Sequence, residues 1–299
     1  MIGVANAPCS WGVLEFELGG SAAGFAQVLD EMRATDYAGT ELGDWGFMPT
    51  DPARLRDELH ARELQLLAAF VPINFSNAHD HAAGEATALR TARLLAVASD
   101  ANPFIVLADE NGKNPTRTKN AGRVTSEHAL NAEEWRIFAE GVERVARAVR
   151  DETGLRSVFH HHCAGFVETP NEIAELMTRT NPELVGLCFD TGHYALGGGE
   201  PLTGLQKHFA RVWHVHFKDF DSRIANAARE NEWDYFDAVR HGIFCELGKG
   251  DVDFAGILNF LKAREYDGWI VVEQDVLPGM GTPRDSAQRN RAFLRALGV

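Results

Sequence analysis

Cysteine is scarce in this chain, and the cysteines that are present lie far apart. The 299 residues include four, Cys9, Cys163, Cys188 and Cys245, and no C-x-x-C pair. This spacing is not typical of a disulfide framework or of a structural zinc site. We therefore expect reduced thiols in a cytoplasmic protein.

Long apolar runs and an excess of positive charge are also missing. No segment reaches the roughly 18 apolar residues that a membrane-spanning helix needs, and the beginning "MIGVANAPCSWG" lacks the pattern of a signal peptide. The formal net charge of −14 disfavours nucleic acids and anionic membrane surfaces, because both would repel the protein. The expected partner is a small-molecule substrate. A homo-oligomer is compatible with the sequence, which locates no interface for one.

What the chain does contain is a regular alternation of strand and helix patterns. Eight short apolar runs read as strands: "IGVAN", "GTELG", "LQLLAAFVPIN", "PFIVLAD", "RSVFHHH", "LVGLCFD", "RVWHVHFKD" and "GWIVVEQD". The segments between them carry apolar residues at helical spacing, as in Phe25, Val28, Leu29 and Met32, and in Trp135, Phe138, Val142, Val145 and Val149.

The connections between these units favour a barrel. The first strand-to-helix turn, "APCSWG", lacks the G-x-G-x-x-G fingerprint of a dinucleotide-binding sheet, and no linker is rich in proline, glycine or serine. We therefore expect an α/β fold, a single (β/α)8 TIM barrel that forms one domain over residues 1–299. Two long excursions, 110–131 and 219–253, should then lie over the active-site face.

The histidine run "HHHCAGFVE" (160–168) is predicted to be a loop. The residues after it carry a helix start, with Thr169 as N-cap, Pro170 at the first helical position and Glu172 completing a capping box. The run therefore connects a strand to a helix.

Four strands end in a residue that can bind a metal: His160, Asp190, His216 and Glu273. A single histidine or aspartate at a strand end is more often a hydrogen-bonding group of a loop. Four at matching positions favour a metal site, because the carboxyl ends of barrel strands converge. Two imidazoles and two carboxylates suit Mn²⁺ or Co²⁺, with Zn²⁺ or Fe²⁺ as alternatives, and suit Mg²⁺ less well.

Other polar and aromatic residues have two interpretations each. Trp11 is a packed aromatic or a wall of the substrate site, and Glu41, in "TELGDWG", closes a loop or binds substrate hydroxyls. His214 shares a strand face with His216 and is predicted to lie deeper, as a core or ligand-supporting histidine. Lys218 either forms a salt bridge with its neighbour Asp219 or acts as an acid near the metal.

Together these motifs resemble one family. "APCSWG", "HHHCAGFVETP", "LCFDTGH", "HVHFKD", "FCELGKGDVDF" and "GWIVVEQD" resemble the xylose isomerase-like TIM barrels of sugar isomerases and epimerases, and within them most closely the inosose dehydratases of inositol catabolism. The resemblance implies that Asp190, His216 and Glu273 are metal ligands. At the strand-five position His160 stands where the ketose epimerases have glutamate, and His162 remains an alternative ligand there.

The resemblance also implies a reaction, the loss of water from a cyclic polyhydroxy ketone through an enediolate to give a dione. Glu273 would take the proton, and His193, His162 or Lys218 would protonate the departing hydroxyl. The residues expected to contact substrate are Trp11, Glu41, His162, His193 and Lys218.

Three other functions share parts of this pattern. A metal-dependent sugar or inosose isomerase or epimerase would use the same enediolate and is the second expectation. An apurinic endonuclease on the same barrel is disfavoured by the acidic charge. A sugar-binding protein without catalysis is disfavoured because all four ligand positions carry competent side chains.

Overall fold

The chain forms a closed barrel of eight parallel strands. The computed structural model describes residues 2–13, 23–277 and 279–299. The barrel closes in the order β1-β10-β7-β6-β5-β4-β3-β2, with β1 paired to both β10 and β2. The strands are β1 (Gly3–Asn6), β2 (Gly39–Glu41), β3 (Gln65–Ile73), β4 (Phe104–Asp109), β5 (Arg156–His160), β6 (Val185–Asp190), β7 (Val212–Phe217) and β10 (Trp269–Val272). Each coincides with a predicted run, and the expected TIM barrel is confirmed.

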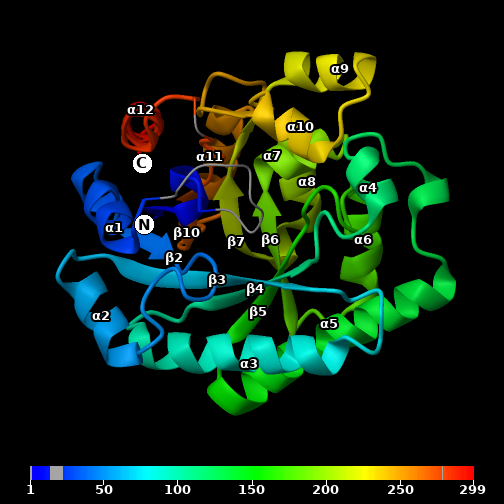
Figure 1. The fold of residues 1–299 in the computed structure, drawn as a ribbon, viewed down its shortest axis with the longest axis horizontal. Helices are drawn as coiled ribbons and strands as arrows, with labels where there is room; N and C mark the ends of the chain where they lie inside the picture. Colours follow the sequence, from blue (N-terminus) through cyan, green and yellow to red (C-terminus); the bar gives the residue numbers. More distant parts are fainter. Residues whose placement is uncertain (1, 14–22, 278) are drawn as a thin grey trace.

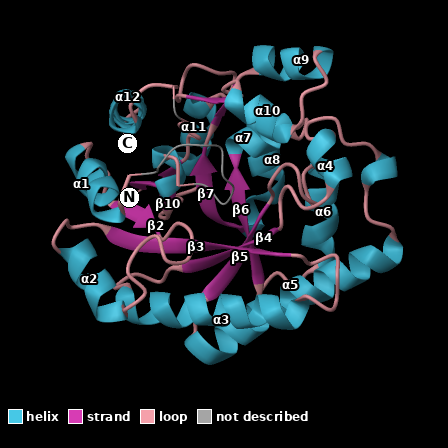
Figure 2. Cartoon of the chain, in the orientation of Figure 1, coloured by secondary structure: helices cyan, strands magenta, loops and turns pink. Residues whose placement is uncertain are grey.

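Helices surround the barrel (Figure 1, Figure 2). They are α1 (Phe25–Ala34), α2 (Pro52–His60), α3 (His81–Ala98), α5 (Ala132–Thr153), α6 (Pro170–Arg179), α7 (Thr191–Leu196), α8 (Pro201–His208), α11 (Phe254–Ala263) and α12 (Pro283–Ala296). The expected apolar faces pack inward, as α5 illustrates with buried Trp135, Phe138, Val142, Val145 and Val149. None of the described helices is long and apolar enough to cross a membrane.

The start of α6 follows the predicted signals. The Thr169 side chain accepts a hydrogen bond from the backbone N–H of Glu172, the Glu172 carboxylate accepts one from the backbone N–H of Thr169, and Pro170 is the first helical residue. This capping box fixes where the loop after β5 ends, and so limits the positions open to the histidines that precede it.

The two long excursions contain short elements of their own. The first holds α4 (Pro115–Lys119) and a 3₁₀ turn (Ser126–His128). The second holds α9 (Ser222–Glu230), α10 (Tyr235–Arg240) and an antiparallel pair of two-residue strands, β8 (Asp219–Phe220) and β9 (Phe244–Cys245). The guanidinium of Arg123 joins the excursions by donating to the carbonyls of Ala228 and Trp233, at 3.1 and 2.9 Å.

The pair β8–β9 was not expected from the sequence, because two residues are too few to carry a strand period. Asp219 stabilises it. Its carboxylate accepts backbone N–H bonds from Gly248, Gly250 and Val252, so Asp219 organises this loop and does not pair with Lys218.

Candidate metal-dependent active site

A pocket of about 630 Å³, including its open mouth, lies at the carboxyl ends of the barrel strands. Its lining residues come from loops and strand ends that are far apart in the sequence: Ala7, Pro8, Cys9, Val13, Glu41, Gly43, Asp44, Phe70, His160, His162, His216, Lys218, Tyr235, Glu273 and Asp275. Parallel strands bring their carboxyl ends to one face, so this is the face on which TIM barrels build active sites.

The four predicted metal ligands, here called the metal group, lie close together, and all of them except Asp190 line this pocket. His160 ends β5, Asp190 ends β6, His216 lies on β7 beside Asp190 in register, and Glu273 directly follows β10. One donor atom from each lies within 4.8 Å of the others. The Oδ2 atom of Asp190 is 3.6 Å from Nε2 of His160 and 3.9 Å from Nδ1 of His216, and Oε1 of Glu273 is 3.1 Å from that Nδ1.

These donor atoms lack other partners. Among the described residues, both ring nitrogens of His160, Oδ2 of Asp190 and Nδ1 of His216 are buried and form no hydrogen bond. The 3.1 Å approach of Glu273 to His216 therefore lacks the geometry of a hydrogen bond. A buried polar atom without a partner is costly, and one divalent cation would satisfy Oδ2 of Asp190, Nδ1 of His216 and one of the two ring nitrogens of His160. The donor set thus fits a metal ion.

Neighbouring groups orient two of the ligands. Asp190 caps α7, with Oδ1 accepting the backbone N–H of His193 at 2.7 Å, which leaves Oδ2 directed toward the metal group. Glu41 accepts hydrogen bonds through Oε1 from Nε2 of His214 at 2.7 Å and from Nε2 of His216 at 2.9 Å. His216 therefore carries a proton on Nε2 and presents Nδ1 to the metal group. His214 lies behind the ligands, as expected.

The electrostatics of these buried groups agree with this arrangement. Burial, followed by the charge of His216, lowers the pKa of His160 to about 3, so its imidazole is neutral. Burial alone would raise the pKa of Glu41, but the charge of His216 and the hydrogen bonds from His214 and His216 hold that pKa well below its usual range. Glu41 is therefore a carboxylate held beneath the metal group.

Lys218 is a buried cation on the wall of the pocket. Its Nζ lies 3.1 Å from Oε2 of Glu273 and 3.6 Å from Oδ1 of Asp275. Burial opposes the charged form, but Asp275 and then Glu273 outweigh this effect and raise the pKa of Lys218 well above its ordinary value. Lys218 is thus an ammonium group shared by two carboxylates. Its ion pairs are with these residues, and not with Asp219 as the sequence suggested.

The histidines expected to contact substrate occupy different depths. His162 lines the pocket and donates from Nδ1 to the carbonyl of Cys163 at 2.7 Å. His193 is fully buried, with its ring centroid 4.0 Å from that of His162 and its Nε2 3.4 Å from Nζ of Lys218. His193 does not line the pocket. It lies behind the wall that His162 and Lys218 form, and its expected contact with substrate stays a prediction.

Trp11 is also placed differently from the substrate-wall interpretation. Its ring is buried in the core between barrel and helices, and its indole N–H donates to Glu31 of α1 at 2.7 Å. The alternative interpretation, a packed aromatic, describes it. Asp44 lies on the pocket wall, while Trp45 is 39% exposed and stacks on Arg90.

Several pocket residues were not identified from the sequence, among them Asp275, Phe70 and Tyr235. Asp275 lies two positions after Glu273 in "VVEQD", which is a signal that could have been used. Phe70 lies within a long apolar strand, and Tyr235 comes from α10 in the second excursion. Neither Phe70 nor Tyr235 lies in a sequence motif that would distinguish it from an ordinary core residue.

Comparison with known proteins agrees with this geometry. Residues 21–297 match the sequence model of the xylose isomerase-like TIM barrel family. The chain belongs to this family. An inosose dehydratase of Lacticaseibacillus casei is 31% identical over 290 residues, which cover 97% of this chain and 95% of that protein. An inosose dehydratase of Bacillus cereus (strain AH820) is 30% identical over 97% of this chain and 95% of its own length.

Solved structures of other enzymes share the fold at low identity. The 3-keto-D-glucoside 4-epimerase YcjR of E. coli superposes with a TM-score of 0.71 at 13% identity, covering 99% of this chain and 100% of that one. The probable 3-DHS dehydratase AsbF of Bacillus anthracis gives a TM-score of 0.68 at 14% identity and covers 99% of both chains. The expectation of an enzyme of the hydro-lyase class is confirmed by the dehydratase relatives, which match nearly the whole chain.

Proposed function

We propose that this protein is a metal-dependent dehydratase that removes water from an inosose such as 2-keto-myo-inositol. The observation that carries the proposal is the convergence of His160, Asp190, His216 and Glu273 on one buried point beside the pocket. At this point the ring nitrogens of His160, Oδ2 of Asp190 and Nδ1 of His216 form no hydrogen bond with the described residues. The inosose dehydratases that match 97% of the chain support the choice of substrate.

In this proposal the four residues hold a divalent cation, with Mn²⁺ or Co²⁺ preferred. When bound, such an ion polarises a substrate carbonyl and makes the neighbouring C–H more acidic. His160 is preferred to His162 as the ligand from the strand-five segment, because Nε2 of His160 is 3.6 Å from Asp190 while Nδ1 of His162 donates to the Cys163 carbonyl.

Glu273 and Lys218 are proposed to move the protons. Glu273 takes a proton from the carbon next to the carbonyl, and the Lys218 ammonium gives one to the hydroxyl that leaves as water. The product is an enol, which tautomerises to a dione. Because Oε2 of Glu273 and Nζ of Lys218 are 3.1 Å apart, the proton can then return from carboxyl to amine. His162, on the same wall, is a further hydrogen-bond donor to substrate.

An isomerase or epimerase is the second candidate function. Asp275 also lines the pocket, 3.6 Å from Lys218, so a second carboxylate is present that could return a proton to the substrate carbon. Burial raises the pKa of Asp275, although the charge of Lys218 opposes this. A carboxyl with a raised pKa holds a proton more readily than an ordinary aspartate, which suits a group that returns a proton to carbon.

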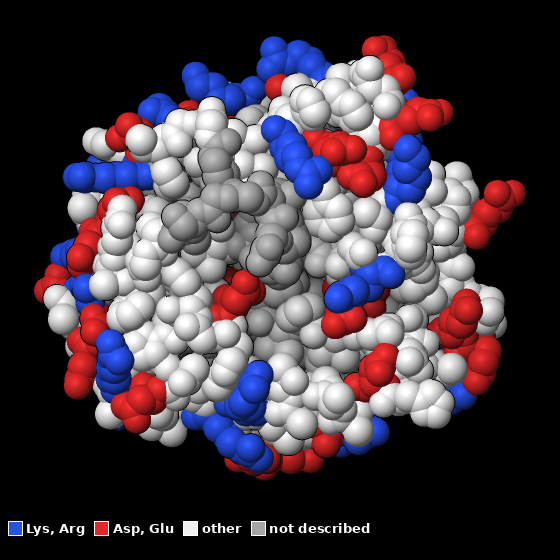
Figure 3. All heavy atoms as spheres, viewed as in Figure 1, with Lys and Arg blue, Asp and Glu red and all other residues white. Residues whose placement is uncertain are grey.

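The charge distribution does not favour an endonuclease. On the face drawn in Figure 3, acidic and basic side chains alternate around the periphery and do not gather into one basic patch. The net charge of −14 points the same way, because DNA binding requires a positive surface along the phosphate backbone.

The experiment that tests the proposal follows 2-keto-myo-inositol by NMR in D₂O with the Mn²⁺-loaded protein. Loss of water, with signals of a dione or its enol, is the expected result. Deuterium exchange or formation of another inosose without loss of water would select the isomerase. No change in the substrate at all would contradict both the dehydratase and the isomerase. The matched control is the same protein sample after removal of its metal.

A further inference from the structure

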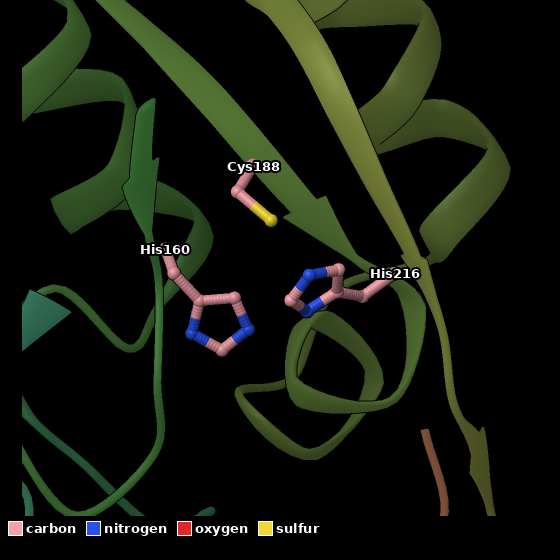
Figure 4. A group of neighbouring side chains, drawn as sticks. All are labelled: His160, Cys188 and His216. Atoms are coloured by element: carbon pink, nitrogen blue, oxygen red, sulfur yellow. The ribbon is translucent and has the colours of Figure 1, made fainter. Parts of the chain in front are cut away.

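Beneath the four ligands lies a thiol that the proposed reaction does not use. Cys188 is on β6, and its Cα pairs in register with that of His160 on β5. Its side chain is fully buried in the barrel interior together with Ala68, Val106 and Val158. Figure 4 shows its sulfur directed toward the space between the imidazoles of His160 and His216.

These three residues have the spacing of a metal site. One donor atom each from His160, Cys188 and His216 lies within 4.8 Å of the others. A cysteine in an apolar barrel interior is by itself an ordinary packing residue. What distinguishes this one is the pair of imidazoles beside it, because both nitrogens of His160 and Nδ1 of His216 are buried and form no hydrogen bond with any described residue.

The donor chemistry of the two sets differs. His160, Asp190, His216 and Glu273 offer two nitrogens and two oxygens, which suit Mn²⁺ or Co²⁺. The deeper set offers two nitrogens and a thiolate sulfur, which suit softer ions such as Cd²⁺ and Zn²⁺. Both sets use His160 and His216. An ion held by one set therefore removes two ligands from the other.

We propose that the barrel has a second, deeper metal position, formed by His160, Cys188 and His216, which takes thiophilic divalent ions. An ion bound there prevents a metal from binding to the set of four ligands that includes Asp190 and Glu273. On binding, the Cys188 thiol releases its proton to solvent and the sulfur joins the ion as thiolate. Its effect on turnover rests on the proposed function. A soft ion seated there withdraws two ligands from the site next to Glu273, and so inhibits the enzyme.

The test uses Cd²⁺ alone with the metal-free full-length protein. X-ray absorption at the Cd edge and the sulfur-to-Cd charge-transfer band in the ultraviolet are expected to show one sulfur ligand. Cys188→Ser should remove both signals. Cys245→Ser is the matched control, since Cys245 lies in β9 outside the group, and should retain them. A Cd²⁺ shell of nitrogen and oxygen only, or signals unchanged in Cys188→Ser, would overturn the inference.

Inhibition supplies a second readout. Loss of a group that only supports a ligand weakens metal binding about 10–100-fold, so loss of the sulfur ligand itself should raise the inhibitory Cd²⁺ concentration by at least about tenfold. Equal inhibition of wild type and Cys188→Ser would contradict the deeper position. The two proposals fail separately. Mn²⁺-dependent loss of water without a Cd–sulfur signal would contradict only the deeper metal position. A Cd–sulfur signal without loss of water would contradict only the proposed dehydratase activity.

Discussion

Oε1 of Glu41, at the end of β2, accepts a hydrogen bond from Nε2 of His216 on β7, 2.9 Å away across the barrel mouth. This bond holds a proton of His216 on Nε2, so that Nδ1, which faces Asp190 and Glu273, is the nitrogen that could bind a metal. A carboxylate behind a histidine ligand both orients the ring and increases its basicity. We therefore propose that Glu41, which also lines the pocket, is a positioning residue for the metal.

Glu41→Gln should weaken Mn²⁺ binding by about 10–100-fold, because the amide keeps the shape of the side chain but loses the negative charge that His214 and His216 share. Isothermal titration of metal-free protein measures this change. Glu246→Gln is the control, since Glu246 pairs with Arg289 outside the site. Unchanged affinity in Glu41→Gln would show that the tautomer of His216 is set by something else.

Glu273→Gln should abolish turnover while the fold remains. Glutamine can neither accept the substrate proton nor form an ion pair with Lys218. In the wild type this ion pair joins Oε2 of Glu273 to Nζ of Lys218 at 3.1 Å. Loss of a positioned acid or base typically costs about 10²–10⁴-fold in rate, and here one oxygen of the metal group is lost too. Circular dichroism checks the fold and the NMR assay the rate. Full activity in this variant would remove Glu273 from the proposed chemistry.

A buried ion pair anchors the first excursion to the barrel. Arg117 on α4 is fully buried, donates to both carboxylate oxygens of Glu172 at 2.8 and 3.0 Å, and donates to the carbonyl of Gly165 in the histidine loop. Arg117→Met leaves the Glu172 carboxylate buried without its partner, which should cost about 3–5 kcal/mol in the free energy of unfolding. Urea denaturation measures this loss.

The matched control for that substitution is Arg136→Met, since Arg136 forms exposed pairs with Glu133 and Glu140 on α5. Water screens exposed pairs, which therefore add little to stability, so this variant should be nearly as stable as wild type. Similar losses in both variants would contradict a special role for the Arg117–Glu172 pair.

Asp109, at the end of β4, should make stability depend on pH. Burial raises its pKa to about 7, against the opposing effects of the N–H groups of Phe166 and Phe75 and the charge of Arg117, while Glu110 adds to the increase. Between about pH 4 and pH 7 the unfolded chain ionises this carboxyl and the folded protein does not. The free energy of unfolding therefore falls as pH rises, by up to about 4 kcal/mol from this group.

Asp109→Asn tests this, because asparagine does not titrate and can still accept the Phe166 N–H bond, which is 2.8 Å long. The stability of wild type relative to the variant should decrease from pH 4 to pH 8 and level off above that range. A difference that stays constant with pH would mean that Asp109 has an ordinary pKa.

The sequence predicted those features that depend on local patterns. All eight barrel strands and the start of α6 at Pro170, after the N-cap Thr169, follow from apolar runs and capping residues within a few positions of each other. The convergence of His160, Asp190, His216 and Glu273 at one point also follows, because strand ends of a barrel must meet. Their role as metal ligands stays a prediction.

What the sequence could not predict depends on packing between distant segments. The ion pairs of Lys218 with Glu273 and Asp275 require the relative positions of β7 and the segment after β10. Tyr235 reaches the pocket from the second excursion, which Arg123 joins to the first through the carbonyls of Ala228 and Trp233. Trp11 and His193 have sequence neighbours typical of site residues, yet the hydrogen bond of Trp11 to Glu31 and the burial of His193 behind His162 turn them away from the pocket.

The most direct test of the account titrates Mn²⁺ into metal-free protein while bound metal and loss of water from 2-keto-myo-inositol are measured in the same samples. The account predicts that activity rises in proportion to bound metal and saturates at one ion per chain. It also predicts that Asp190→Asn, which removes one ligand but keeps the cap of α7, neither binds Mn²⁺ at these concentrations nor turns over substrate. Full loss of water without metal, or normal metal content and activity in Asp190→Asn, would contradict a metal-dependent site at the four strand ends.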